Sequence, residues 1–337
     1  MSDIMEGIRR TARTRIQRLL LAEADDDRIV RAADRLARDG IARVGFVGEP
    51  DRLRATARRA DVTLNGVEGI DALAEDEIAR TRGALKEARG ERLTPADAEK
   101  YPRDPLFQAA ARVRLGMADL FVAGATRTTA DVLRATLWLI GLAPGVRTLS
   151  SFFLMVVPGG TGTADRVLLF ADCAVVPDPT PEQLAEIGIM AADSFSRLTR
   201  GIPHTAFLSF STRGSAEHPR VDKVRQAVEI ARGRRSDLHF DGEMQADAAL
   251  VPDVARRKAS DSVVAGHADV LIFPDLDSGN IGYKLVQRLA GAKAYGPILM
   301  GPARQANDLS RGCSTEDVIE TATIACAVSG ALAGATV

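Results

Sequence analysis

Short apolar runs alternate along this chain with segments whose apolar residues recur at helical spacing, and this alternation constrains the fold most. Residues 19–22 form an apolar run that is followed by three aspartates and by a helical pattern over 29–37. The pattern predicts a strand, a helix cap and a helix. Gly40 then ends the helix and residues 42–47 supply the next strand, so the segment predicts a unit of a parallel sheet.

The same rhythm returns three times further along the chain. The predicted strands and the helices that follow them are 118–122 with 128–140, 206–210 with 221–231, and 270–273 with 281–289. Regular alternation of this kind predicts an α/β fold. The charged segment 76–100 is rich in helix-favouring residues and predicts solvated surface helices of a first domain.

One segment departs from the rhythm. Two apolar runs, 149–157 and 166–176, flank the glycine-rich segment 158–163. This arrangement predicts adjoining antiparallel strands joined by a hairpin turn. A phosphate-binding loop is the alternative, but the segment lacks both the lysine of a P-loop and G-x-G-x-x-G spacing.

Composition excludes several classes of protein. The chain has 337 residues, of which 46% are hydrophobic, and this predicts about two globular domains. A net charge of -1 and 4% aromatic residues provide neither a basic field nor stacking surfaces, so we expect no nucleic acid and no membrane as partner. Three widely spaced cysteines and four histidines without i, i+4 spacing predict no disulfide framework and no metal. Uncharged stretches are too short to span a bilayer, which predicts a soluble, cytoplasmic protein.

The densest cluster of polar residues, 307–317, lies directly before an apolar helical pattern. At a helix start, free backbone N–H groups favour an anion, and Arg311 adds a planar group that binds phosphate through two hydrogen bonds. Ser314 and Asp317 also resemble a capping box in which Asp substitutes for Glu. On the local pattern alone, this structural role is favoured for Asp317.

Several long motifs, in order, resemble those of the phosphate acetyltransferase (phosphotransacetylase) family, within the phosphate acetyl/butyryltransferases. From the N-terminal side they are 124–125 with 128–134, 170–175, 208–215, 241–249, 273–284, 296–299 and 307–314. The resemblance implies reversible transfer of an acetyl group between acetyl phosphate and coenzyme A, by direct thiolate attack in a ternary complex. It also implies coenzyme A and acetyl-CoA as substrates, with no tightly bound cofactor.

The resemblance assigns roles to residues of the cluster. Asp317 is implied as the base that deprotonates the thiol, Arg311 as the group that holds the phosphoryl group, and Ser310 as a donor to the developing oxyanion. Arg134, with Thr128 and Thr129, is implied as a second anion contact. Substrate contacts are also implied, with turn-making or capping as an equal alternative, for residues of the second domain: Ser211, Thr212, Asn280, Tyr283 and Lys284.

The chain departs from the family pattern in places. It has Arg127-Thr128-Thr129 where the family usually has His-Ser-Thr, and aspartates at 269 and 277 where asparagine is usual. The family's basic segment is also altered, which leaves Lys86, Arg89 and Arg92 as alternative contacts for the adenosine-phosphate end of coenzyme A. As charges on a surface helix, each of the three has an ordinary structural explanation.

The resemblance implies a two-domain isocitrate/isopropylmalate dehydrogenase-like architecture with the active site in the interdomain cleft. The first domain is expected at 1–146 plus 301–337 and the second at 147–300, with a homodimer formed mainly through the second. A phosphate acyltransferase for butyryl or propionyl groups is the nearest alternative, because one or two methylenes change binding by only about 1–3 kcal/mol. A non-catalytic acetyl-CoA-binding regulatory module and a dehydrogenase are alternatives from other classes.

Overall fold

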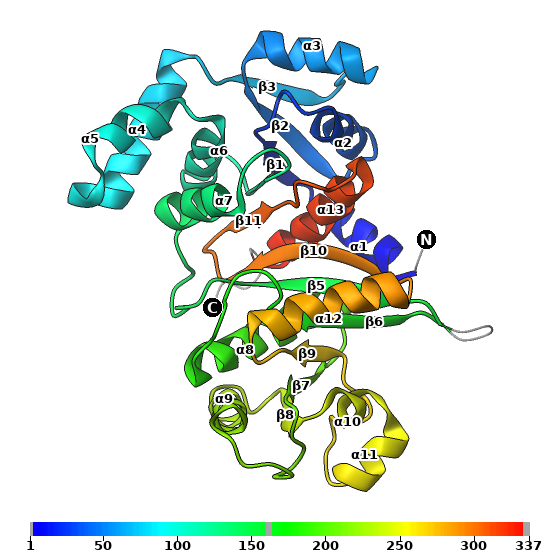
Figure 1. The fold of residues 1–337 in the computed structure, drawn as a ribbon. Helices are drawn as coiled ribbons and strands as arrows, with labels where there is room; N and C mark the ends of the chain where they lie inside the picture. The colour runs from blue at the N-terminus through cyan, green and yellow to red at the C-terminus, as the bar shows by residue number, and fades with distance from the viewer. Residues whose placement is uncertain (1–2, 160–163, 333–337) are drawn as a thin grey trace. The chain divides into compact units, whose positions relative to one another are not determined.

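The computed structural model describes residues 3–159 and 164–332, and its contacts divide the chain into two compact units. Unit 1 comprises residues 3–144 and the final segment from residue 302. Unit 2 comprises residues 145–301. Both are α/β units, as the alternation in the sequence predicts (Figure 1).

Unit 1 is built on a five-stranded, all-parallel sheet with strand order β11-β4-β1-β2-β3. Its central strands are buried on both faces, as in a parallel sheet that helices cover on both sides. The strands are β1 (Gln17–Leu21), β2 (Ala42–Gly48), β3 (Val67–Asp71), β4 (Leu120–Ala123) and β11 (Gln305–Asp308).

Helices cover both faces of this sheet. Leu20, Val47 and Phe121 point to the face covered by α6, where they join a core that includes Phe107. On the other side of the strands, α2 packs against α13, and α13 against α1 (Figure 1). The helices are α1 (Asp3–Thr14), α2 (Asp27–Arg38), α3 (Pro50–Ala60), α4 (Glu75–Arg89), α5 (Pro95–Lys100), α6 (Pro105–Arg114), α7 (Thr129–Ala135) and α13 (Thr315–Leu332), with short helices η1 (Gly90–Arg92), η2 (Tyr101–Arg103) and η3 (Thr136–Ile140).

Unit 2 is built on a six-stranded mixed sheet with strand order β10-β5-β6-β9-β7-β8. β5 runs antiparallel to both neighbours, and the strands from β6 to β8 are parallel. The strands are β5 (Ser150–Val157), β6 (Arg166–Ala171), β7 (His204–Leu208), β8 (His239–Met244), β9 (Val270–Ile272) and β10 (Lys293–Met300). The antiparallel pair confirms the predicted adjoining strands, whereas residues 160–163 of the glycine-rich segment lie outside the described residues.

The helices of unit 2 pack against the parallel part of its sheet and against its antiparallel edge. α8 and α9 contact each other and strands β6 to β9, whereas α12 contacts β5, β6 and β10. Tyr283 of α12 packs against the core that contains Phe153 and Phe170. The helices are α8 (Pro181–Thr199), α9 (Pro219–Arg234), α10 (Ala246–Leu250), α11 (Pro252–Lys258) and α12 (Leu276–Leu289).

Three sequence predictions need correction. The predicted helix over 128–140 changes after Ala135 into a π-helical turn, η3. The strand predicted to reach Phe210 ends at Leu208, and the Phe210 side chain is exposed. The helices expected as solvated surface include α4, which packs on α6 and buries Glu77 in an ion pair with Arg112 at 2.7 Å.

No described helix has the length and apolar character that a membrane span requires. Among the described side chains, no group of three or more His, Cys, Asp or Glu is placed to hold a metal ion. The cysteines Cys173, Cys313 and Cys326 are all buried and form no disulfide.

Candidate active site

The loop between β11 and α13 carries the polar cluster that the sequence predicts as the reaction centre. β11 ends at Asp308, and the amide of Cys313 then donates to the carbonyl of Ser310 at 2.9 Å, which closes a turn. This turn leaves the side chains of Ser310 and Arg311 exposed. Because it follows the carboxyl end of a parallel strand, the turn lies where α/β folds bind ligands.

Arg311 has a fixed backbone and a free side chain. Its carbonyl accepts a hydrogen bond from Nη1 of Arg28 at 2.9 Å. Its guanidinium makes no hydrogen bond or ion pair with any residue in the described parts of the chain. The planar donor group of Arg311 is therefore available to an external anion.

Asp317 lies in the first turn of α13 and caps it. Its Oδ2 accepts hydrogen bonds from the amide and the hydroxyl of Ser314, both at 2.8 Å, and its own amide donates to the Ser314 hydroxyl at 3.1 Å. This is the capping box that the sequence predicts. The two bonds from Ser314 engage Oδ2 of the exposed carboxylate and leave Oδ1 for a second role.

Arg28, in the first turn of α2, is a site residue that sequence reasoning missed. Its Nη1 donates to the carbonyls of Arg311 and Cys313, at 2.9 and 2.7 Å, and its Nη2 donates to the carbonyl of Ala125 at 3.0 Å. Arg28 therefore joins the loop after β4 to the turn that carries Arg311. Because Arg28 lies 285 residues before Cys313, no local pattern in the sequence indicates their hydrogen bond.

The residues predicted at the start of α7 lie beside the end of β11. Thr128 is the N-cap of α7 and accepts from the amide of Asp131 at 3.2 Å. Thr129 donates from its hydroxyl to Oδ2 of Asp308 at 2.6 Å, which ties α7 to the end of β11. Arg134 pairs with Asp131 at 2.9 Å and is about one-third exposed.

Asp308 is the most perturbed carboxyl near this loop. Burial, with a further contribution from the charge of Glu23, raises its pKa to about 6, although the hydrogen bond from Thr129 opposes that shift. Its Oδ1 is buried and has no hydrogen-bond partner among the described residues. Near neutral pH this side chain therefore holds a proton more readily than an ordinary aspartate.

Cys313 lies in the same turn but is a poor nucleophile. Burial raises the pKa of its thiol to about 11, although the positive charge of Arg28 opposes the shift. A thiol with such a pKa is almost entirely protonated at neutral pH. This agrees with the direct-transfer mechanism that the family resemblance implies.

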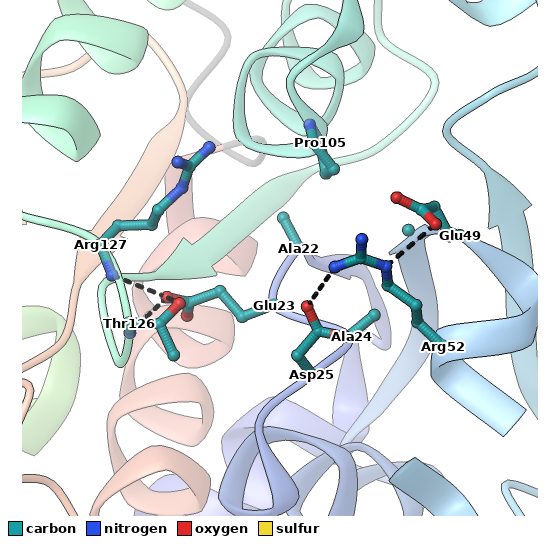
Figure 2. Close-up of a pocket in the computed structure, with 10 residues that line it drawn as sticks. Ala22, Glu23, Ala24, Asp25, Glu49, Arg52, Pro105, Thr126 and Arg127 are labelled. Atoms are coloured by element: carbon teal, nitrogen blue, oxygen red, sulfur yellow. Dashed lines mark hydrogen bonds and ion pairs between the residues drawn. The ribbon is translucent and has the colours of Figure 1, made fainter. Parts of the chain in front are cut away.

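A pocket of about 370 Å³ opens at the carboxyl ends of β1 and β2 (Figure 2). Glu23, Thr126 and Arg127 line one side of it, and Glu49 and Arg52 line another. Arg52 is paired with Glu49 at 2.9 Å, and Arg127 is paired with a carboxylate outside the lining. Both arginines of this pocket are thus neutralised by partners, in contrast to Arg311.

In unit 2, Ser211 and Thr212 are buried in a hydrogen-bonded turn. Ser211 donates to Oε1 of Glu243 at 2.8 Å, and the hydroxyl of Thr212 bonds to the Gln245 side chain at 3.2 Å. Burial opposes ionisation of Glu243, yet the hydrogen bond from Arg225, together with bonds from the turn, lowers its pKa to about 2. These contacts favour the turn-making interpretation for Ser211 and Thr212.

The three predicted residues of α12 have different environments. Asn280 donates from Nδ2 to the carbonyl of Cys173 at 3.0 Å, and Tyr283 stacks on Phe153 with ring centroids 4.1 Å apart. Lys284 is exposed, with its Nζ 5.3 Å from the centroid of the Tyr283 ring. Of the three, Lys284 is the most available to a ligand.

The chain is thus an α/β protein with an unpaired arginine and a capped carboxylate at the carboxyl end of a parallel sheet, a place where α/β folds bind ligands. The family described as phosphate acetyl/butaryl transferase matches residues 3–326, and the chain belongs to this family.

Relatives and solved structures agree with this membership. The phosphate acetyltransferase of Clostridium acetobutylicum is 44% identical over 96% of this chain and 97% of its own. A phosphotransacetylase from Streptococcus pyogenes superposes with a TM-score of 0.91 at 39% identity, over 98% of this chain and 99% of its own. The phosphotransacetylase from Staphylococcus aureus gives a TM-score of 0.87 at 34% identity, over 97% of this chain and 98% of its own.

Proposed function

We propose that this chain catalyses the reversible transfer of an acetyl group between acetyl phosphate and coenzyme A. Membership of the phosphate acetyl/butaryl transferase family supports this reaction, as do the relatives named phosphate acetyltransferase. The observation that carries the proposal is the exposed guanidinium of Arg311, which has no partner in the described chain and stands beside Ser310 at the start of α13.

The proposed mechanism assigns one task to each residue. Arg311 binds the phosphoryl group of acetyl phosphate through its planar pair of donors. Oδ1 of Asp317 accepts the proton of the coenzyme A thiol, whose ordinary pKa of about 8.5 leaves it mostly protonated at neutral pH. The thiolate sulfur then bonds to the acetyl carbon, Ser310 donates to the oxyanion, and phosphate leaves with the electrons of the broken C–O bond.

Further residues are proposed to bind the substrates, and we propose that the reaction proceeds without a tightly bound cofactor. Arg134 is proposed as a second anion contact, and Thr128 and Thr129 are proposed to shape the start of α7. In unit 2, Asn280, Tyr283 and Lys284 are proposed to contact coenzyme A. For Ser211 and Thr212 we propose a positioning role, because their hydroxyls are engaged within the turn.

We also propose that the two units are the two domains of an isocitrate/isopropylmalate dehydrogenase-like architecture with the active site in the cleft between them. The supporting argument is the family resemblance, with the first domain at 1–146 plus 301–337 and the second at 147–300. Closure of such a cleft would expel water that competes with the thiol for the acetyl group.

The three unpaired cysteines support a reducing, cytoplasmic location.

A homodimer formed through unit 2 is proposed as the working state. On α12, the side chains of Ile281, Leu285 and Leu289 are 56%, 53% and 82% exposed. Their spacing of four residues places them on one face of the helix. An apolar face of this kind supports burial against a second copy, in agreement with the family resemblance.

The proposed reaction is tested by phosphate release from acetyl phosphate with the purified protein. Release is expected only when coenzyme A is present, and acetyl phosphate is expected to give a higher kcat/KM than propionyl or butyryl phosphate. A preference for butyryl phosphate would assign the chain to the longer-chain acyltransferases. Binding of acetyl-CoA without turnover would assign it to the regulatory modules.

A further inference from the structure

In unit 1, several backbone amides converge on the carboxylate of Glu23 and donate hydrogen bonds to it. Glu23 lies two residues after the end of β1, and its carboxylate accepts hydrogen bonds from four consecutive amides in the loop after β4, which we call the 124–127 loop. The amides of Gly124 and Ala125 bond to Oε2 at 3.0 and 3.1 Å, and those of Thr126 and Arg127 bond to Oε1 at 2.6 and 3.1 Å. Figure 2 shows the carboxylate of Glu23 directed at Thr126 and Arg127.

The carboxylate of Glu23 is almost fully satisfied by this loop. The Thr126 hydroxyl adds a fifth hydrogen bond to Oε1 at 2.8 Å, and the Glu23 residue is only 6% exposed. Successive backbone N–H groups that converge on one point form a binding site for an anion. In this chain the anion is the protein's own side chain.

This anion site lies at the carboxyl ends of β1 and β4, which are neighbours in the sheet of unit 1. From β1 the chain continues to β2 and β3 on one side, and only later reaches β4 on the other side of β1. The carboxyl ends of β1 and β4 therefore flank a topological switch point, where α/β folds bind ligands. Since Glu23 fills the donors there, these amides are not available to a substrate phosphate, which agrees with the assignment of that role to Arg311.

The 124–127 loop also supports the candidate active site. The carbonyl of Ala125 accepts from Arg28, which bonds to the Arg311 carbonyl as well. Gly124 has a φ of 119°, and a side chain there would approach the amide of Leu309 to 2.6 Å. The loop leads directly into Thr128, the N-cap of α7. Displacement of the loop would therefore disturb both segments of the site.

We infer that Glu23 is a positioning residue of the acetyl transfer, because its carboxylate fills the amides of the 124–127 loop and thereby holds the turn of Arg311 in place through Arg28. This role rests on the proposed function. Glu23 itself does not touch the reacting groups. Its removal should lower kcat more than it alters the KM for either substrate, since it misplaces groups that act in the transition state.

The pocket beside Glu23 makes the inference testable by chemical rescue. Glu23 lines that pocket of about 370 Å³ together with Thr126 and Arg127, so a small anion can reach the amides when the side chain is removed. In Glu23→Ala, formate carries the missing carboxylate. We expect kcat of this variant to fall about 10²-fold. Formate should restore it about tenfold or more, while sodium chloride of equal ionic strength should not.

Glu49→Ala is the matched control. Glu49 lines the same pocket, but its hydrogen bond is to the Arg52 side chain rather than to the loop amides. This variant should keep the wild-type kcat and should not respond to formate. A folded Glu23→Ala enzyme with wild-type kcat, or with a low kcat that formate leaves unchanged, would overturn the inference.

A second variant and a second readout keep the inference separate from folding and from the proposed reaction. Glu23→Gln fills the space but turns an amide NH₂ toward backbone donors, so it should be slow and insensitive to formate.

Formate should also raise the Tm of Glu23→Ala but not of Glu49→Ala, whether or not the wild type transfers acetyl groups. Inactive wild-type protein would contradict the proposed function. An unchanged Tm of Glu23→Ala in formate would contradict the claim that a carboxylate occupies the loop amides. If Glu23→Ala does not fold, wild-type kcat in Glu23→Gln would overturn the inference.

Discussion

Arg311 differs from the other arginines near the site because its guanidinium lacks a partner, whereas Arg134 and Arg127 are paired with carboxylates. A carboxylate partner occupies some donors of an arginine and offsets its charge, so a paired arginine attracts a substrate anion less strongly. An unpaired guanidinium avoids this competition and offers two parallel donors in a fixed plane. These contacts are the reason why we propose Arg311, rather than Arg134 or Arg127, as the phosphate-binding group.

Arg311→Lys should weaken the binding of acetyl phosphate. A lysine keeps the charge but replaces the planar pair of donors with a point contact. We expect the KM for acetyl phosphate to rise about tenfold and the KM for coenzyme A to change little. Arg304→Lys is the control, because Arg304 is also exposed and makes no hydrogen bond or ion pair in the described chain. An unchanged KM in Arg311→Lys would contradict the assignment.

Asp308 should make the protein less stable as the pH rises. Its pKa is raised to about 6 in the folded protein, against about 3.9 in an unfolded chain, so the folded state binds more protons between these values. The free energy of unfolding should therefore fall between about pH 4 and pH 6, by about 2–3 kcal/mol from this group.

Asp308→Asn removes this contribution while keeping an acceptor for Thr129. Urea titrations at several pH values should show that the variant loses less stability than the wild type across this window. Asp51→Asn alters a highly exposed carboxyl and is the control. Identical pH profiles for the wild type and Asp308→Asn would show that Asp308 is ionised in the fold.

At the scale of elements, the start of α13 combines a helix cap with the carboxylate that we propose as the base. The Ser314 hydroxyl accepts from the amide of Asp317 and donates to its carboxylate. Ser314→Ala should lower the free energy of unfolding by about 1 kcal/mol, the usual cost of a lost N-cap. Its kcat should fall only a fewfold, because the Ser314 amide still orients the carboxylate. A loss of kcat as large as that of an Asp317 variant would show that the hydroxyl itself takes part in the reaction.

The elements of this fold were largely predictable because parallel strands are buried on both faces. Such strands appear in the sequence as short apolar runs, as at β1 and β4. The π-helical turn η3 was not predictable, because its residues satisfy the same spacing as an α-helix. Phe210 extended an apolar run by two residues beyond the strand, and only tertiary structure shows it to be exposed.

The candidate site was predictable where it is contiguous and unpredictable where it is not. Ser310, Arg311 and Asp317 lie in one short segment with a recognisable pattern. Glu23 and Arg28 form hydrogen bonds with backbone groups about 100 and 285 residues away, and backbone groups carry no sequence pattern. In the sequence these two residues are recognisable only as an acidic residue and an arginine that follow a predicted strand.

At the scale of the whole molecule, the exposed apolar face of α12 predicts the oligomeric state. Sedimentation equilibrium should give a dimer for the wild type. Leu285→Asp should give a monomer, because it places a charge in the centre of the face. Ile202→Asp changes a side chain that is 66% exposed outside α12 and should leave the dimer intact. A dimer that persists in Leu285→Asp would move the interface elsewhere.

The most direct test of the proposed mechanism is the kcat of Asp317→Asn for acetyl-CoA formation from acetyl phosphate and coenzyme A. Asparagine retains an oxygen for the hydrogen bonds from Ser314, so the helix cap and the fold should persist. Removal of a general base should lower kcat by about 10²–10⁴-fold with little change in either KM. Folded Asp317→Asn protein that turns over at close to the wild-type rate would contradict the mechanism.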